Sequence, residues 1–450
     1  MSIDQYSTTP SNNDLANYFK TGMRPSQVKT AGWDIMADLA SYAVSLPTAG
    51  GSANALTAAN GRPFGALVPG LLQILNPATD STGPATFAPD GLATTNIYGN
   101  GLPLAGGELQ AGVPAFLKYD GTQWNLLNPA PPGKNFMVDP CCRVAQTGTS
   151  ASPALGTSRA YGAVDLVQCW ASGTAVSAGS ITQDTAYTVA GAATAYSCKL
   201  AGCTITGTGK VFFRRWIESR DAIALKNRNV LFSVLGFQDT GGNINAFLTI
   251  NKATAQDNFA SVTNVTTGFT VSLPTNTTTA VTAVAAMGDC SSGIEIVLEM
   301  DCGAVTTKDF YATDWQVCIN TLAQVCVAPR FIDELQGVKR WYERSWPYGV
   351  LTGTTSFPGQ KTTHVPVGYS GGNGINEMDV YFEVEKGVTP IVMLYSEATG
   401  SMGKLRDATT GADVAVSVGV LATTMFEPAT GTAIAAGDLL RMHWTADARL

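Results

Sequence analysis

The sequence contains few charged residues and almost no histidine. Only 14% of its 450 residues are Asp, Glu, Lys or Arg, and its two histidines, His364 and His443, lie far apart. A serine or cysteine triad therefore has little material for a general base. The net charge of −7 argues against nucleic acid as a partner, because nucleic-acid binding needs a basic surface that displaces counterions from phosphates. We expect neither a hydrolytic triad nor a nucleic-acid partner.

Long apolar runs are also missing. No stretch approaches the ~20 apolar residues that cross a bilayer, and the N-terminal MSIDQYSTTPSNNDLANYFK has no basic segment followed by an apolar one. The sequence thus predicts a chain that is made in the cytosol, stays soluble and does not insert into a membrane. Without a secretion signal, the nine cysteines are expected to be reduced core residues.

The spacing of cysteine and histidine does not indicate a metal centre. Cys198 and Cys203 stand close together, but a zinc site needs four converging ligands, and both histidines are far away in sequence. We expect no metal site and no cofactor.

Glycine, proline and short β-branched runs are abundant. The 47 Gly and 22 Pro, together with tracts such as TAYTVAGAATAYS, are typical of short strands and turns. The sequence predicts a mainly β protein with a short N-terminal helix, a small β domain, a jelly-roll or β-sandwich domain, a short connecting helix and a C-terminal β domain. The predicted ranges are 1–45 for the N-terminal tail and attachment helix, 46–133 for the small β domain, 134–332 for the jelly roll, 333–346 for the connecting helix and 347–450 for the C-terminal β domain.

The predicted N-terminal helix begins near Pro25 and carries one apolar stripe, with residues recurring three or four apart. The stripe could pack on its own domain, or it could meet identical helices or a partner protein. The residues we expect to make contact with identical helices or with a partner protein are Tyr18, Phe19, Val28, Ala31, Trp33, Ile35 and Leu39.

Two local patterns are specific enough to predict a turn and a helix. In AFLKYDGTQWNLL, residues 115–127, Asp120 and Gly121 suit a two-residue type I′ hairpin turn. In DELQGVKRWYERSWPYG, residues 333–349, Asp333 is the expected N-cap and Pro347 the expected stop, which predicts a helix that joins two β domains.

The helix segment also carries a resemblance. PRFIDELQGVKRWYERSWPYG resembles a segment that recurs in tail fibres and related appendage proteins of tailed bacteriophages and prophages, although Gly337 and Trp341 stand where Cys and Tyr are usual. Three further segments, NYFKTGMRPSQVKTAGWDIMADLA, LAGGELQAGVPAFLKYDGTQWNLLNP and NFMVDPCCRVAQTGTS, are similar to segments of the same family. The matching positions in the helix segment are Glu334, Leu335, Arg340, Tyr342, Glu343, Ser345, Pro347, Tyr348 and Gly349.

The resemblance implies a structural protein of the virion, assembled in the host bacterial cytoplasm. Its implied partners are itself as a homotrimer, other virion proteins of the tail, baseplate or capsid, and a host surface glycan. The N-terminal end would be held by the particle, and the distal domains, including the carbohydrate-binding-like jelly roll, would meet the host. The alternative to a tail fibre is a capsid (head) fibre or decoration protein. A glycan depolymerase is a less favoured alternative.

Surface aromatics are the expected contacts with a host glycan, although any one of them could instead belong to a core. The C-terminal candidates are Tyr369, Tyr381, Tyr395 and Trp444. A depolymerase would need paired carboxylates. Asp301 is one available acid, whereas Glu383 and Glu385 alternate on one predicted strand face and are expected to be solvated. We therefore expect no enzymatic activity and no catalytic residue.

Overall fold

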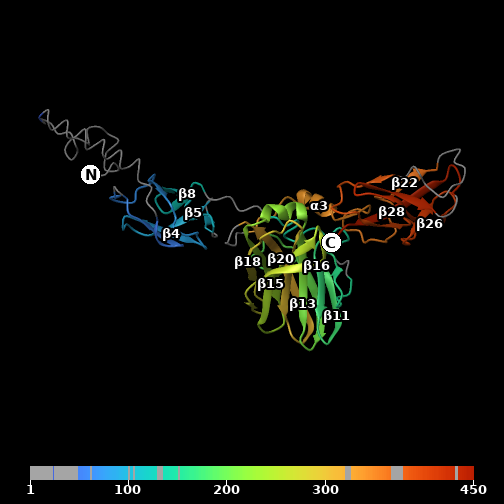
Figure 1. Cartoon of the computed structure of the whole chain (residues 1–450), viewed down its shortest axis with the longest axis horizontal. Helices are drawn as coiled ribbons and strands as arrows, with labels where there is room; N and C mark the ends of the chain where they lie inside the picture. The colour runs from blue at the N-terminus through green and yellow to red at the C-terminus, as the bar shows by residue number, and fades with distance from the viewer. Residues whose placement is uncertain are drawn as a thin grey trace. The chain divides into compact units, whose positions relative to one another are not determined.

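The computed structural model describes residues 24, 49–60, 63–99, 102–104, 107–128, 135–149, 153–319, 326–365, 379–430 and 434–450. The chain splits after Gly133: Met1–Gly133 belongs to the first compact unit, and Lys134–Thr321 and Cys326–Leu450 belong to the second. Strands dominate both units (Figure 1), so the mainly β prediction is confirmed. Among the described residues, no helix is both long and apolar enough to span a bilayer.

The first unit is built on one sheet. The strands follow the order β1-β2-β4-β5-β8-β7-β3, with β6 paired to β5. Trp124 is fully buried. Its ring contacts Phe87 edge-on and Tyr119 at a tilt, both with ring centroids 5.3 Å apart. The aromatic core therefore lies under the middle of the sheet. The strands are β1 Gly50–Ser52, β2 Ala55–Ala58, β3 Leu72–Leu75, β4 Ala85–Pro89, β5 Thr95–Gly99, β6 Leu102–Pro103, β7 Ala115–Tyr119 and β8 Trp124–Leu126.

The predicted two-residue turn between β7 and β8 is wrong. The connection is the four residues 120–123, and only Gly121 among them has a positive φ, +112°. The Asp120 carboxylate accepts hydrogen bonds from the N–H groups of Thr122 and Gln123 at 2.8 and 2.9 Å. An Asp side chain that bonds the backbone ahead of it stabilises a wider turn, and this local bonding replaces the type I′ geometry.

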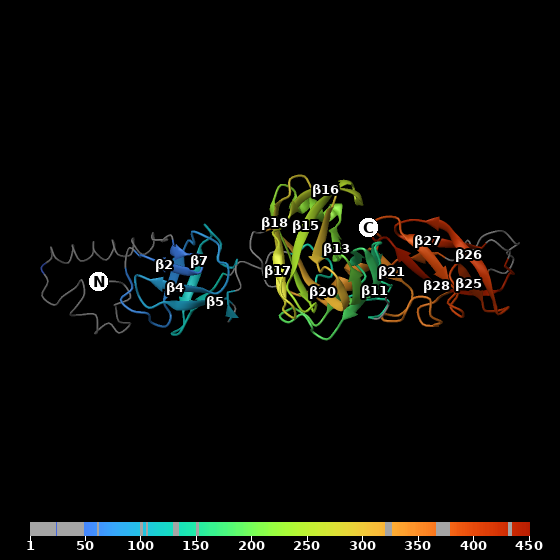
Figure 2. The ribbon, with the colours of Figure 1, turned by 90° about the horizontal axis from the view of Figure 1, so that it is seen from below.

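The second unit begins with a β-sandwich of two antiparallel sheets, which Figure 2 shows from below. The seven-stranded sheet follows the order β16-β15-β19-β13-β10-β9, with β17 paired to β15, and the five-stranded sheet follows β11-β12-β20-β14-β18. Side chains from both sheets, including Phe213, Phe232, Leu298 and Phe310, fill the space between them and are fully buried. This is the sandwich that the sequence predicts.

The bounds of its elements are as follows. The seven-stranded sheet contains β9 Ala160–Tyr161, β10 Gln168–Ser172, β13 Lys210–Ile217, β15 Ile244–Ala255, β16 Asn258–Thr267, β17 Val271–Leu273 and β19 Ile294–Asp301. The five-stranded sheet contains β11 Ala175–Asp184, β12 Ser197–Thr206, β14 Asn229–Gln238, β18 Thr279–Ala286 and β20 Val305–Cys318. The short helices α2 Ser219–Ala222 and η3 Ile223–Leu225 follow β13.

The connecting helix is shorter than predicted. Helix α3 spans Phe331–Lys339 with Arg330 at its N-cap, so it begins before the expected cap at Asp333. The chain then forms strand β21, Tyr342–Arg344, which pairs with β28, Leu439–Asp447. The predicted helix 333–346 is therefore wrong in its second half. Backbone pairing with a strand more than a hundred residues later in the sequence overrides the helical spacing, and local pattern cannot reveal such a partner.

The C-terminal sheet follows the order β21-β28-β25-β26-β27-β23, with β22 and β24 also paired to β28. Its core includes Phe382, Phe426 and Trp444, which contact one another. A second apolar cluster joins this sheet to the sandwich, since Trp216 packs with Trp341 and Ala448. The remaining strands are β22 Lys361–His364, β23 Val380–Tyr381, β24 Ile391–Tyr395, β25 Lys404–Asp407, β26 Ala412–Leu421 and β27 Met425–Thr430.

Candidate functional site

The outer face of the seven-stranded sheet carries aromatic side chains that the core does not use. On β10, Cys169 and Ala171 point into the sandwich, so Trp170 between them points outward. On β13, Val211 and Phe213 point inward and Phe212 points outward. Both outward rings remain partly exposed. A strand that buries one face normally presents polar side chains on the other, so two partly exposed rings here require an explanation.

Strand register brings these two rings into contact. Trp170 pairs directly with Phe212 across β10 and β13. The rings are stacked, with centroids 4.7 Å apart and planes 6° from parallel. The guanidinium of Arg159 lies 4.9 Å from the centre of the Trp170 ring. Arg159, Trp170 and Phe212 therefore form a stack that covers both faces of the Trp170 ring and one face of Phe212.

The other face of Phe212 looks across β19. Glu299 lies on β19, directly opposite Phe212 on β13 and directly opposite Phe247 on β15. Neighbouring strands lie about 4.8 Å apart, so β13 and β15 are separated by roughly 9.6 Å. We call the row Phe212, Glu299 and Phe247 the aromatic slot. It consists of one aromatic side chain on each outer strand with the carboxylate of Glu299 on the strand between them.

The charges beside the aromatic slot are paired with one another. Lys210 donates a hydrogen bond to Glu299 and lies 3.1 Å from an oxygen of Asp301. Hydrogen bonds to Glu299 and Asp301 raise the pKa of Lys210. Burial raises the pKa of Glu299, although its bond with Lys210 opposes that shift. The slot thus offers hydrogen-bond donors and acceptors at fixed places, with one lysine shared between two carboxylates.

On the outer face of the seven-stranded sheet, the end away from the aromatic slot is covered by other residues. Arg214 pairs with Glu295, and Asn251 donates to the same carboxylate at 2.7 Å; these side chains are buried. The backbone oxygen of Leu450 accepts hydrogen bonds from Tyr161 at 2.7 Å and from Arg214 at 3.1 Å. The last residues of the chain thus cover this end, and the aromatic slot lies on the half that stays accessible.

The three described aromatic residues predicted as glycan contacts differ in exposure and do not form one surface. Tyr381 on β23 is 66% exposed and available for contact. Tyr395 is half-buried and packs edge-on against Trp346 at 5.2 Å. Trp444 is only 6% exposed and belongs to the core of the C-terminal sheet, which excludes it as a surface contact. Tyr369 lies outside the described residues.

The residues proposed for attachment, Tyr18, Phe19, Val28, Ala31, Trp33, Ile35 and Leu39, also lie outside the described residues. The slot residues were missed because sequence reasoning searched the C-terminal domain for exposed aromatics. The signal was present in QCWAS and KVFF, where an aromatic occupies the outward position of an alternating strand.

The carboxylates considered for an enzyme are not placed as a catalytic pair. Asp301 faces Lys210 on the sandwich. Glu383 is paired with Lys339 and its side chain is 62% exposed, and Glu385 is exposed. Neither glutamate lies on a strand, because β23 ends at Tyr381, so their predicted alternation on one strand face is wrong although both are solvated.

One histidine does meet a serine. His443 Nδ1 lies 2.8 Å from Ser345 Oγ, and its Nε2 lies 2.7 Å from the carbonyl oxygen of Ser356. The imidazole is fully buried and stacks on Trp346 at 4.3 Å. Ser345 Oγ also accepts a hydrogen bond from the N–H of Trp444 at 2.9 Å, so the hydroxyl is tied to the backbone of β28. The pair holds β28 beside the segment that follows β21.

Comparison with known proteins finds similarity to solved structures at low identity. No family model and no curated protein matches the chain. Among solved structures, TmCBM61 in complex with β-1,4-galactotriose is 8% identical and covers 42% of this chain and 99% of its own, with a TM-score of 0.25. The CBM22-2 xylan-binding domain from Paenibacillus barcinonensis Xyn10C is 15% identical and covers 34% and 91%, with a TM-score of 0.24.

The enzymatically active domain of Bacteriophage CBA120 tailspike protein 4 is 12% identical and covers 41% of this chain but 21% of that one, with a TM-score of 0.26. Identities and TM-scores this low carry no conclusion about the role of this chain.

Proposed function

We propose that this chain is a structural protein of a tailed-bacteriophage particle, of the tail-fibre or appendage type, and that its sandwich binds a glycan of the host surface. The observation that carries the binding role is the aromatic slot, in which Phe212 and Phe247 face each other across Glu299. Aromatic walls with a few fixed polar groups are the usual composition of a small-ligand site. The four sequence segments that resemble phage appendage proteins support the virion role.

The charge pattern favours a neutral sugar. Lys210 is paired with both Glu299 and Asp301, and Arg159 lies 3.8 Å from a carboxylate oxygen of Glu295. A strongly charged sugar would have to break one of these pairs, whereas hydroxyl groups can bond to them as they stand. The apolar face of a pyranose ring would lie against the free face of Phe212.

The first experiment measures binding of the full-length protein to an array of immobilised bacterial O-chain and capsular polysaccharides. Phe212→Ala and Phe247→Ala are expected to weaken binding about ten- to a hundredfold, because each removes an aromatic contact worth roughly 1.5–3 kcal/mol. Phe357→Ala is the matched control, since Phe357 is 65% exposed but lies outside the slot. Unchanged binding in both slot variants would contradict the proposal.

Tyr381 provides a direct test of the competing location in the C-terminal sheet. Tyr381→Ala should leave glycan binding unchanged if the aromatic slot is the site. Loss of binding in this variant alone would move the contact to the C-terminal sheet. A point variant is preferable to truncation after Ser345, because truncation removes β28, the partner of β21, and uncovers the sandwich near Tyr161.

The assembly state and the position in the particle are separate parts of the proposal. A homotrimer predicts a solution mass near three times the 46.9 kDa of one chain, measured by light scattering. A clean monomer would mean that trimer formation requires the particle or does not occur. Labelled antibody on intact particles distinguishes a tail fibre from a capsid fibre, because the label would lie at opposite ends of the virion.

The proposal also includes the absence of glycan cleavage. A depolymerase would shorten the bound polysaccharide during incubation, which size-exclusion chromatography of the glycan detects. We expect an unchanged elution profile, because Glu299 in the slot and Asp301 beside it are both held by Lys210.

A further inference from the structure

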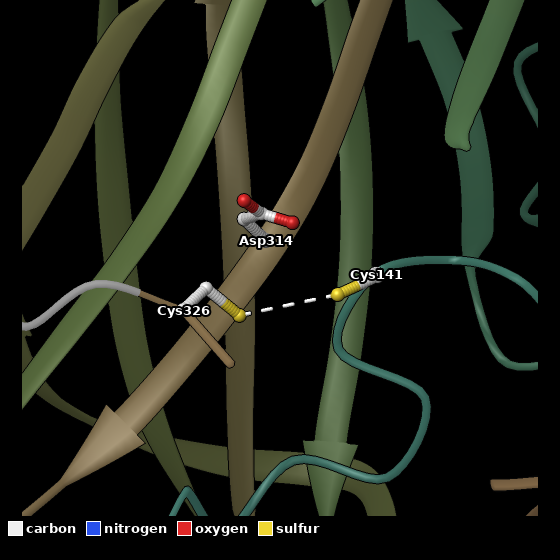
Figure 3. A group of neighbouring side chains, drawn as sticks. All are labelled: Cys141, Asp314 and Cys326. Carbon is white, nitrogen blue, oxygen red and sulfur yellow. Dashed lines mark hydrogen bonds between the residues drawn. The ribbon is translucent and has the colours of Figure 1, made fainter. Parts of the chain in front are cut away.

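Three side chains with metal-binding atoms meet at one end of the sandwich. Cys141, Asp314 and Cys326 come from three separate segments, and their ligand atoms all lie within 4.8 Å of one another (Figure 3). The group lies within the second unit. Sequence spacing did not indicate this cluster, because the two cysteines are 185 residues apart.

The distance between the sulfur atoms suits a shared metal ion. Cys141 Sγ and Cys326 Sγ are 4.0 Å apart. Two thiolates bound to one tetrahedral zinc ion, each with a Zn–S bond of about 2.3 Å, lie roughly 3.8 Å apart. A disulfide would require about 2.0 Å, so the sulfurs sit at ligand spacing and not at bonding spacing.

The carboxylate of Asp314 is incompletely satisfied. Its Oδ2 accepts a hydrogen bond from the N–H of Ala193 at 2.7 Å, and Oδ1 is buried; the other donor to this carboxylate is the weak thiol donor of Cys141. Asp314 is 3% exposed, and none of the ion pairs found among the described residues includes it. A buried carboxylate that has one backbone donor and one weak thiol donor, but no cation, is costly unless a cation is supplied.

The backbone is distorted to bring Asp314 to this place. Asp314 has φ +52°, and the register between β14 and β20 shifts beside it. Before the shift, the core residues are at even positions, Phe310 and Ala312. After the shift, they are at odd positions, Trp315 and Val317. Asp314 is thus the extra residue of a β-bulge, a device that redirects side chains near functional sites.

We propose that Cys141, Cys326 and Asp314 Oδ1 bind a thiophilic divalent cation, for which Zn²⁺ is the probe. On binding, each thiol releases its proton to solvent and the carboxylate supplies the third ligand, so the ion is held by three negative groups. A water molecule would complete the tetrahedron. The ion would link the segment that enters the sandwich to the segment that leaves it, and would stabilise the fold by mass action.

A second cysteine pair provides the matched control. Cys169 and Cys198 also lie close, with sulfurs 3.8 Å apart in the sandwich core. Within the part of the chain that the structure describes, no carboxylate or histidine joins this pair in a three-ligand group. If sulfur spacing alone sufficed, both pairs would bind metal. The proposal requires that only the pair with Asp314 does.

The test loads the reduced full-length protein with Zn²⁺, removes free metal and measures bound zinc by mass spectrometry. We expect about one zinc per chain in the unsubstituted protein and in Cys169→Ala, and loss of nearly all of it in Cys141→Ser and in Asp314→Asn. Loading with Co²⁺ should produce a thiolate-to-cobalt charge-transfer band in the first two proteins and not in the last two. Asp314→Asn keeps the size of the side chain, so it remains informative if the cysteine variant does not fold.

Three results would overturn the proposal. The first is the absence of bound zinc and of the cobalt band in the unsubstituted protein. The second is equal loss of zinc in Cys169→Ala and Cys141→Ser. The third is a Cys141–Cys326 disulfide. It would appear as a mass lower by two hydrogens in protein purified without reductant, together with no bound zinc after the protein is reduced.

Discussion

Lys386 and Glu343 form an ion pair that is closed off from solvent. Lys386 Nζ donates to a carboxylate oxygen of Glu343 and to the carbonyl oxygens of Lys339 and Val384, the latter two at 2.6 and 2.9 Å. The other oxygen of Glu343 accepts the N–H of Glu383 at 3.0 Å. The pair therefore joins the end of α3 and strand β21 to the segment that precedes β24.

The ion pair predicts a large and asymmetric mutational effect. Lys386→Met should lower the free energy of unfolding by about 3–5 kcal/mol, because it leaves Glu343 buried without its cation. Adding Glu343→Leu should recover part of that loss, since no buried charge remains. Glu383→Gln, at an exposed pair, should cost at most about 1 kcal/mol. Chemical denaturation measures all three, and equal losses for Lys386→Met and Glu383→Gln would contradict the prediction.

His443 predicts a pH dependence of stability. Burial lowers the pKa of His443 below its ordinary value of 6.5. At pH below about 6.5 the unfolded chain takes up a proton on this imidazole before the folded chain does, so the free energy of unfolding should fall as the pH falls through that range. Above it, both states are neutral and the contribution is fully present. Denaturation at about pH 7.5 and about pH 5.5 should show the drop.

The control for this pH effect is His443→Gln, whose amide can bond both Ser345 and the Ser356 carbonyl but does not titrate. The variant should lose part of the difference between the two pH values. An unchanged difference would assign the effect to other groups.

At Arg449 we expect the planar shape of the guanidinium, and not only its charge, to stabilise the fold. Its guanidinium lies between the rings of Tyr161 and Tyr342, 4.1 and 4.2 Å from their centres, and donates to the backbone oxygen of Asp165 at 3.1 Å. Arg449→Ala should lower the free energy of unfolding by about 2–4 kcal/mol. Arg449→Lys should recover only a part, because an ammonium cannot stack as a plane between two rings. Full recovery in thermal denaturation would show that charge alone matters.

We expect replacement of glycine by alanine to lower the free energy of unfolding more at Gly359 than at Gly403. Gly359 has φ +85°, and a Cβ there would lie 1.9 Å from the carbonyl oxygen of Ser345. Gly403 has φ +69° with open space around the position. Gly403→Ala should cost about 1–2 kcal/mol for the backbone conformation alone, and Gly359→Ala about 2–4 kcal/mol because the clash adds to it. Similar melting temperatures for the two variants would contradict this ranking.

Several features could be predicted because they depend on residues that are neighbours in sequence. Alternation in LLRMHWTAD predicts a strand, and this segment is strand β28. The helix in FIDELQGVK follows from local spacing as well. Its end could not be predicted, because Tyr342–Arg344 becomes a strand only in the presence of β28.

The candidate sites show the same division. Alternation alone places Trp170 and Phe212 outward on their strands, but only the order of strands in the sheet makes them stack and sets Phe247 across from Phe212. Trp444 was proposed as a surface contact because aromatic side chains commonly bind glycans, but its packing against Phe426 places it in the core.

The amino-acid pattern thus settles the class of the protein: mainly β, low in charge and poor in histidine, with short strands between glycine-rich turns. These properties follow from composition and from the two-residue period of a strand, both of which are local. The aromatic slot, the Lys386–Glu343 pair and the Cys141–Asp314–Cys326 cluster depend on which strands become neighbours. That choice is made by packing the whole chain, which brings together residues as far as 185 positions apart.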